Sequence, residues 1–160
     1  MDERAYWVGF NRVRGIGAVR VRALLDFFGS LEMAWQATPI ALRSAGLPEK
    51  VVEAVLEKRR VLTLEQELEQ IQESGIGLLT WLDDGYPRRL KEIAQPPPVI
   101  YVRGELLDED DWAAAIVGTR RVTAYGRQVT ADVATYLGAH TVTVVSGLAR
   151  GVDAIAHDAV

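Results

Sequence analysis

Two glycine-containing segments carry the residue types that could hold a phosphate group. The first, Gly118-Thr119-Arg120-Arg121, directly follows the apolar run 113–117, and the second, residues 146–151, directly follows the β-branched run 141–145. Glycine lets the backbone come close to a ligand, and arginine supplies charge-assisted hydrogen bonds to phosphate. The chemistry that these residue types indicate is therefore the binding of an anion.

The elements around these segments are expected to bring them together. Apolar residues 129, 133, 136 and 137 recur at helical spacing, which predicts a helix that ends at Gly138 between two short strands. A strand–helix–strand unit is almost always parallel and right-handed, so both segments should leave one sheet edge and enter helix N-termini, which attract anions. The alternative is two ordinary strand-to-helix turns with solvated arginines. The residues predicted to line this phosphate-binding crevice are Gly118, Thr119, Arg120, Arg121, Gly126, Arg127, Ser146, Gly147, Ala149, Arg150 and Gly151.

Other motifs of phosphate or catalytic chemistry do not match these segments. The spacing is neither the G-x-G-x-x-G of dinucleotide-binding proteins nor a Walker loop, and Ser146 does not lie in a G-x-S-x-G elbow. Asp153 and His157 are four residues apart on one helix face and could form an acid–base pair. We interpret them instead as supporting residues, with Asp153 at a helix N-terminus and His157 packed behind it, because no third catalytic group converges on them. Tyr125 could stack on a base, although single aromatic residues more often serve packing.

The composition limits the classes of function. A net charge of −4 over 160 residues argues against binding nucleic acid over the whole surface, so any DNA contact must come from local basic patches. The chain has no cysteine, and its two histidines show no metal-ligand spacing, so neither a metal nor a cofactor is expected. No apolar run approaches the ~20 residues that span a membrane, and the N-terminus is not a signal peptide. These features favour a cytoplasmic protein.

A second place for DNA contact lies near the N-terminus. Two amphipathic helical patterns, residues 6–13 and 21–28, flank Arg14-Gly15-Ile16-Gly17, as in a helix-hairpin-helix unit. In that motif the turn offers backbone N–H groups to a DNA phosphate, and nearby arginines can support the contact. The alternative is a turn that only joins two helices. The predicted hairpin contacts are Gly15, Gly17, Arg20 and Arg22.

The remaining patterns divide the chain into two domains. Residues 44–48 resemble a second hairpin, but Pro48 replaces its second glycine and removes a donor, so we interpret this hairpin as structural. Helical spacing continues to residue 71, and we expect an all-α, helix-hairpin-helix or SAM-like domain over residues 1–75. Residues 76–160 are predicted to form part of a Rossmann-like α/β domain with about four strands in one parallel sheet. Such sheets usually have more strands, which predicts that the chain is truncated and has an exposed sheet edge.

A family resemblance rests on three stretches of sequence. "AIVGTRRVTAYGRQV", "VVSGLARGVDAIAH" and, upstream, "DDGYPRRLKEIAQPPPVIYVRGEL" are similar to segments of the bacterial DNA-processing protein A family, DprA, also called Smf. The resemblance covers nearly the whole chain, and Asp153 and His157 match the family's second motif. Members of the family are longer, and their Rossmann-like domain continues beyond the point where this chain stops.

The resemblance implies a noncatalytic recombination mediator. Such a protein binds and protects single-stranded DNA and helps to load the RecA recombinase during natural transformation of competent cells. It would also form a homodimer through parts that this chain does not contain. Two alternatives remain open: a nucleoside monophosphate phosphoribohydrolase, whose fold is related but whose glutamate-bearing motif is absent here, and a helical protein-interaction module on an inert sheet.

Overall fold

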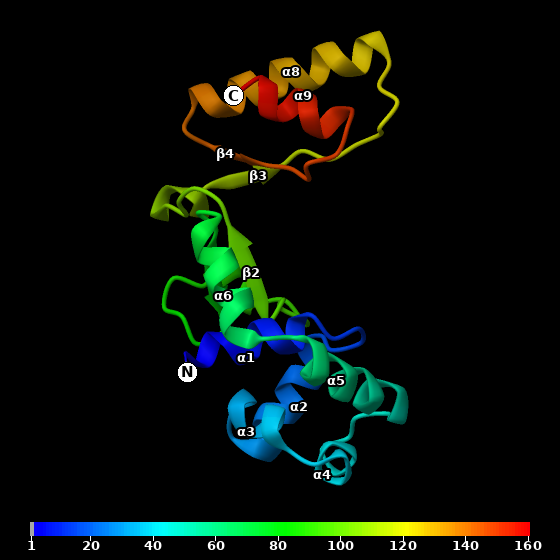
Figure 1. Cartoon of the computed structure of the whole chain (residues 1–160). Coiled ribbons are helices and arrows are strands. Elements are labelled where there is room, and N and C mark those ends of the chain that lie inside the picture. Colours follow the sequence, from blue (N-terminus) through cyan, green and yellow to red (C-terminus); the bar gives the residue numbers. More distant parts are fainter. Residues whose placement is uncertain (1) are drawn as a thin grey trace. The chain divides into compact units, whose positions relative to one another are not determined.

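The computed structural model describes residues 2–160, without the side chains of residues 108 and 109. The chain forms two compact units, one up to Glu105 and one from Leu106 onward. The helices and strands of the first unit are α1 (Glu3–Asn11), α2 (Ala18–Phe28), α3 (Leu31–Gln36), α4 (Pro39–Ser44), α5 (Glu49–Val61), α6 (Leu64–Glu73), β1 (Gly77–Thr80), α7 (Arg88–Lys91) and β2 (Val99–Val102). Those of the second unit are the 3-10 turn Asp108–Asp111, β3 (Ala113–Ala115), α8 (Ala124–Ala139), β4 (Thr143–Val145) and α9 (Val152–Asp158). Figure 1 labels α1 to α6, β2 to β4, α8 and α9.

The helix boundaries of the first unit follow local capping residues. The hydroxyl of Ser30 accepts a hydrogen bond from Met33 N, and the hydroxyl of Thr38 accepts one from Ala41 N before Pro39 opens α4. Gly29 ends α2 at a φ of 79°, in the left-handed region that glycine enters freely. Each of these helix ends is therefore set by residues only a few positions away along the chain.

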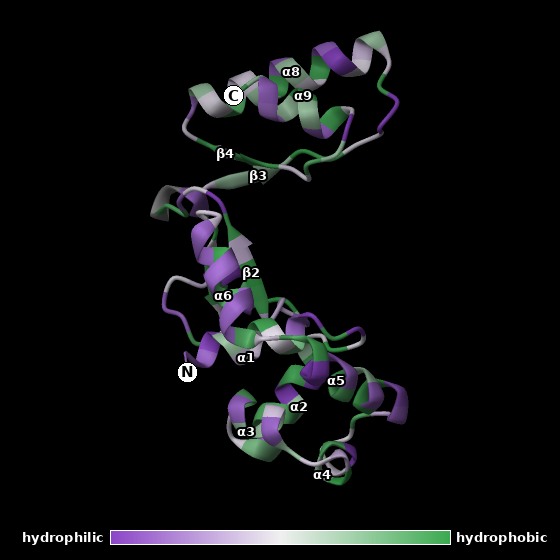
Figure 2. Ribbon diagram, viewed as in Figure 1, coloured by the Kyte–Doolittle hydropathy of each residue, from purple (hydrophilic) through white to green (hydrophobic). Residues whose placement is uncertain are grey.

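One helical core holds the first unit together. Trp7 and Phe10 of α1 pack with Leu24 of α2, and the ring of Phe10 meets Trp35 of α3 edge-on, with centroids 5.0 Å apart. The buried residues of α5 and α6 are all apolar and recur at helical spacing: Val51, Val52, Val55, Leu64, Leu68 and Ile71. The glutamates between them make the outward face of α6 hydrophilic, as the purple parts of its ribbon show in Figure 2.

Strands β1 and β2 form an antiparallel pair, with Gly77 opposite Val102 and Thr80 opposite Val99. The prediction of one parallel sheet with about four strands is therefore wrong in the described residues, which contain two separate pairs of strands. The physical reason lies in the connection between β1 and β2. Trp81 Nε1 and the Tyr86 hydroxyl both donate to the carbonyl of Pro97, at 3.1 and 2.8 Å, and hold the returning chain beside β1.

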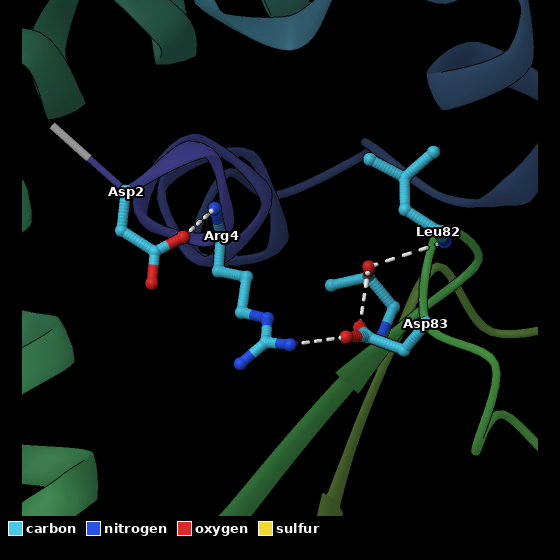
Figure 3. A network of polar contacts seen from close by, with 5 residues as sticks. Asp2, Arg4, Leu82 and Asp83 are labelled. Atoms are coloured by element: carbon cyan, nitrogen blue, oxygen red, sulfur yellow. Dashed lines mark hydrogen bonds and ion pairs between the residues drawn. The ribbon is translucent and has the colours of Figure 1, made fainter.

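A polar network joins α1 to the turn after β1. Arg4 of α1 makes an ion pair with Asp83, whose other carboxylate oxygen accepts hydrogen bonds from the backbone N–H and the hydroxyl of Thr80, at 2.7 and 2.8 Å. Figure 3 shows this arrangement, together with Asp2, which caps α1. Because Thr80 is fully buried, the network fixes the end of β1 against the helical core.

The two compact units do not coincide with the domains that the sequence predicts. Leu78, Trp81 and Val99 pack with the helical core, so both strands of the first pair belong to the same unit as the helices before residue 75. The domain boundary near residue 75 remains a prediction, because a compact unit defined by contacts need not be an evolutionary domain.

The second unit is a β–α–β–α arrangement. Strands β3 and β4 are parallel, with Ala113 opposite Thr143 and Ala115 opposite Val145, and Figure 1 shows α8 and α9 together on one face of the pair. Helix α8 continues to Ala139, one residue past the predicted stop, and Thr141 takes the positive φ of 54° that turns the chain toward β4. This unit confirms the α/β class. No helix in the described part of the chain is long and apolar enough to cross a membrane.

Candidate nucleic-acid interface

The two glycine segments leave the same edge of the β3–β4 pair. Ile116 N donates to Val145 O at 2.9 Å, which extends the parallel ladder by one residue beyond β3. The Ser146 hydroxyl then donates to Ile116 O at 2.6 Å and ties the start of the second segment to the first. The structure thus brings together the two segments that the sequence places at one sheet edge.

Beyond the ladder, the two segments touch through their backbones. Val152 N donates to Thr119 O at 3.2 Å. Gly151 has a φ of 95°, and a Cβ there would collide with Thr119 O and lie 2.7 Å from Arg120 Cα. A Cβ on Gly118 would lie 2.6 Å from the side chain of Val152. The glycines are therefore needed for the close approach of one segment to the other, and the two segments behave as one interlocked structure.

Two arginines line an open hollow at the interlocked segments. An open cavity of about 530 Å³ is lined by Arg120 of the first segment and by Ala149 and Arg150 of the second. Both arginines are exposed, and neither makes an ion pair with a carboxylate in the described part of the chain. Two unpaired guanidinium groups beside one open hollow are suited to binding phosphate oxygens.

Several predicted contacts have their polar groups engaged elsewhere. The hydroxyl proton of Ser146 is donated to Ile116 O, and Thr119 Oγ1 accepts from Arg121 N at 3.1 Å. The N–H of Gly126 donates to the capping hydroxyl of Thr123 at 3.1 Å, so this amide is not free for a phosphate. The side chains of Arg121 and Arg127 are exposed, but they are not among the residues that line the hollow. Of the four predicted arginines, Arg120 and Arg150 are thus the two whose side chains line the hollow.

The two supporting residues differ in their surroundings. Asp153 is buried in the first turn of α9, and its Oδ2 would lie 2.9 Å from a Cβ on Gly147, so this glycine makes room for the carboxylate. A carboxylate in the first turn complements the helix dipole. His157 is exposed and does not pack behind Asp153 as the sequence suggests. No ion pair joins the two side chains in the described structure, and no group of three or more metal-ligating residues occurs there.

The N-terminal hairpin has the expected backbone shape. Gly15 has a φ of 92°, Ile16 is buried, and Gly17 immediately precedes α2. The guanidinium of Arg20 donates to the carbonyl of Gly15 and so stabilises the turn itself. Arg22 instead lies over the ring of Trp81, 5.6 Å from its centroid, and keeps an exposed side chain.

The second hairpin carries an ion pair, rather than a free cation, at its turn. Gly46 has a φ of 90° and Leu47 is buried, but the next helix opens with Pro48 and then Glu49. The guanidinium of Arg43 donates two hydrogen bonds to the Glu49 carboxylate, at 2.5 and 2.6 Å, and these bonds hold the pKa of Glu49 below its ordinary value. The pair leaves no unneutralised cation at this turn, and Pro48 has no backbone N–H, which agrees with the structural interpretation of this hairpin.

Sequence reasoning missed two features near these surfaces. Leu148, in the second glycine segment, is 99% exposed, although the sequence directs attention only to the glycines and arginines around it. The contacts of Trp81 and Tyr86 with Pro97 were also not foreseen. Their only signal in the sequence is the presence of aromatic residues shortly before a run of three prolines.

Comparisons with known proteins point to one family. The family model for "DNA recombination-mediator protein A" matches residues 77–160. Protein Smf of Synechocystis is 40% identical over 161 residues, which cover 98% of this chain and 40% of that protein, and DNA processing protein DprA of Bacillus subtilis is 32% identical over 138 residues, covering 78% and 45%.

Structural similarity extends over both units. The crystal structure of DNA processing protein A from Streptococcus pneumoniae superposes with a TM-score of 0.70 and 23% identity, over 97% of this chain and 53% of that one. The chain thus spans about 40% of the length of its first curated relative and about half of the solved one. The sequence resemblance to DprA is confirmed, and the chain belongs to the DNA recombination-mediator protein A family.

Proposed function

We propose that this chain supplies the single-stranded DNA-binding crevice of a recombination mediator. The observation that carries the proposal is the hollow between the two interlocked glycine segments, lined by the unpaired side chains of Arg120 and Arg150. Backbone phosphates are the part of DNA that such a site recognises, and phosphate contacts position a strand without reading its sequence. A mediator that must accept incoming DNA of any sequence needs this kind of contact.

The wider role is proposed from family membership. Relatives carry the names DNA processing protein DprA and DNA recombination-mediator protein A. We propose that this protein protects incoming single strands in the cytoplasm during natural transformation and helps to load RecA onto them. We also propose that it forms a homodimer, and that the crevice is noncatalytic, with Asp153 and His157 as supporting residues.

We propose a separate contact with DNA at the N-terminal hairpin, through Gly15, Gly17, Arg20 and Arg22. The free space near the turn supports it, since Gly15, Gly17 and Arg20 line an open hollow together with Gln95. Arg20 is partly engaged by the Gly15 carbonyl, so Arg22 is the stronger candidate for a ligand contact.

Titration of the 160-residue chain with fluorescein-labelled oligothymidine tests the proposal. Fluorescence anisotropy should give saturable binding whose affinity falls linearly with the logarithm of the salt concentration. Mixed-sequence single strands of the same length should bind with similar affinity. Binding that is absent at low salt, or release of a free base from a nucleoside monophosphate, would refute the proposed function of this crevice.

A further inference from the structure

Two cations of the first unit are held on the faces of aromatic rings. The guanidinium of Arg22, on α2, lies 5.6 Å from the ring centroid of Trp81, and the ammonium of Lys91, at the end of α7, lies 5.8 Å from that of Tyr86. Contacts of this length are attractive cation–π interactions. Both side chains are exposed, so each cation is positioned by a ring and still open to solvent.

The two rings are themselves fixed by one carbonyl group. Trp81 Nε1 and the Tyr86 hydroxyl both donate to Pro97 O, and Tyr86 is almost completely buried. Trp81 also meets the ring of Trp7 edge-on, with centroids 5.7 Å apart. Arg22 and Lys91 therefore lie on a rigid support, which lowers the entropy that each side chain loses when it binds an anion.

Neither cation is neutralised by a carboxylate in the described part of the chain. Other arginines of this unit are paired, as Arg12 is with Glu67 at 3.0 Å and Arg88 with Glu92 at 3.5 Å. Arg22 and Lys91 form no such pair. Their charges are available to a ligand outside the chain.

The surface beside Arg22 is open and shallow. One hollow is lined by Ala18, Val19, Arg22, Ala23, Asp26 and Ala94, and a second by Ala18, Val19, Arg20, Gln95 and the hairpin residues 15–17. The two hollows share Ala18 and Val19 and end on neighbouring residues 94 and 95, so they form one continuous strip along α2. Ala18 and Ala23 are small residues in this strip, and Asp26 is the acidic residue in its lining.

We propose that this strip, which Arg22 lines, together with Lys91 on the same support of rings and Pro97 carbonyl, binds the sugar–phosphate backbone of double-stranded DNA. The aromatic rings explain why a duplex fits better than a single strand. Single-strand sites usually stack bases on aromatic faces, whereas here cations cover the faces of Trp81 and Tyr86. A duplex, which keeps its bases stacked inside and presents phosphates, matches a surface of fixed cations.

The second hairpin offers no cation of this kind. Arg43 is paired with the Glu49 carboxylate at its turn, and Pro48 has no backbone N–H to donate. Arg22 and Lys91 would supply the second phosphate contact in its place. This inference rests on the hairpin contact proposed above, but it is independent of the single-strand crevice, because it uses only residues of the first unit.

The test is a charge reversal with a matched control. A labelled 20-base-pair duplex and oligothymidine of the same length are titrated with the wild-type chain, with Arg22→Glu/Lys91→Glu, and with Lys50→Glu/Arg60→Glu. The control pair also reverses one lysine and one arginine, both exposed, on α5. Arg22→Glu/Lys91→Glu should weaken duplex binding at least tenfold and flatten the log–log salt dependence by about 1.8, since each lost phosphate contact is worth about 0.9. Oligothymidine binding should change no more than in the control.

The milder pair Arg22→Gln/Lys91→Gln guards against a folding defect. It removes both charges, and it should weaken duplex binding severalfold with an unchanged circular dichroism spectrum. The proposal is overturned if the wild-type chain does not bind the duplex, or if the Arg22/Lys91 variants bind it like wild type. It is also overturned if the α5 control weakens binding equally, or if an acidic peptide competes as well as unlabelled duplex. Arg120→Ala, which addresses the crevice, should leave duplex binding unchanged.

Discussion

Replacing Arg120 with alanine is the most direct probe of the crevice. Arg120 lines the hollow with Ala149 and Arg150, and its backbone is in contact with Gly151. Its side chain makes no ion pair within the described structure, so removing it leaves no buried charge without a partner. The variant should therefore fold like the wild type and differ only in the bound state.

The expected loss follows from one phosphate contact. A charged hydrogen bond contributes roughly 1.5–3 kcal/mol. Arg120 is exposed, and solvent screening reduces this value toward its lower end. Since about 1.4 kcal/mol corresponds to a factor of ten, Arg120→Ala should weaken oligothymidine binding ten- to thirtyfold. Losing one contact should also flatten the log–log salt dependence by about 0.7 for a single strand.

Fluorescence anisotropy at two or more salt concentrations measures both quantities. Arg120→Lys should recover only part of the affinity, because an ammonium lacks the planar fork of a guanidinium. Arg60→Ala, a matched loss of an exposed arginine on α5, should bind like the wild type. If Arg120→Ala binds oligothymidine with the wild-type affinity and salt slope, DNA does not occupy this hollow and the reasoning fails.

Three further predictions concern stability, measured by urea unfolding. Gly151→Ala should destabilise the second unit by more than about 2 kcal/mol, because the new Cβ would collide with the Thr119–Arg120 backbone. The control Gly104→Ala, also at positive φ but with no neighbour within 4 Å, should destabilise the protein less. Equal losses of stability in the two variants would refute the steric argument. Burial raises the pKa of Asp83, but hydrogen bonds from Thr80 and the charge of Arg4 outweigh it and hold the pKa below its ordinary value near 4. This stabilisation is present above the unfolded-state pKa and is lost as pH falls through the lower folded-state pKa. Asp83→Asn should lower the free energy of unfolding by about 1 kcal/mol at pH 7 and remove this pH dependence. An Asp83→Asn variant that loses stability in acid just as the wild type does would contradict this prediction. Tyr86→Phe should cost about 1 kcal/mol through loss of its bond to Pro97 O, with no change in oligothymidine binding.

The sequence predicts best what is decided locally. Ser30, Thr38 and Gly29 set helix ends through contacts within a few residues, and the structure has those ends. The strand–helix–strand pattern around α8 likewise fixes that both glycine segments leave one sheet edge, since the handedness of such a connection hardly varies.

Long-range contacts explain what the sequence could not show. Strands β1 and β2 pair because Trp81 and Tyr86 hold a carbonyl that lies 16 and 11 residues away along the chain, and no local pattern encodes that contact. The amide of Gly126 is unavailable because Thr123 caps α8, which is a competition between two local signals. Of the predicted crevice residues, only the three-dimensional arrangement separates Arg120 and Arg150, which line the hollow, from Arg121 and Arg127, which do not.

The pairing of charges, rather than their number, distinguishes the surfaces of this acidic chain. With 18 basic and 22 acidic residues, the composition argues against binding nucleic acid over the whole surface. Yet Arg4, Arg12, Arg43 and Arg88 are held by carboxylates, and these pairs contribute to the structure rather than to a basic surface. The cations without a carboxylate partner in the described residues include Arg120 and Arg150 at one hollow, Arg22 at another, and Lys91 over the ring of Tyr86. A phosphate backbone responds to such local, unneutralised charge over about one Debye length, ~8–10 Å, so a net charge of −4 is compatible with both proposed contacts.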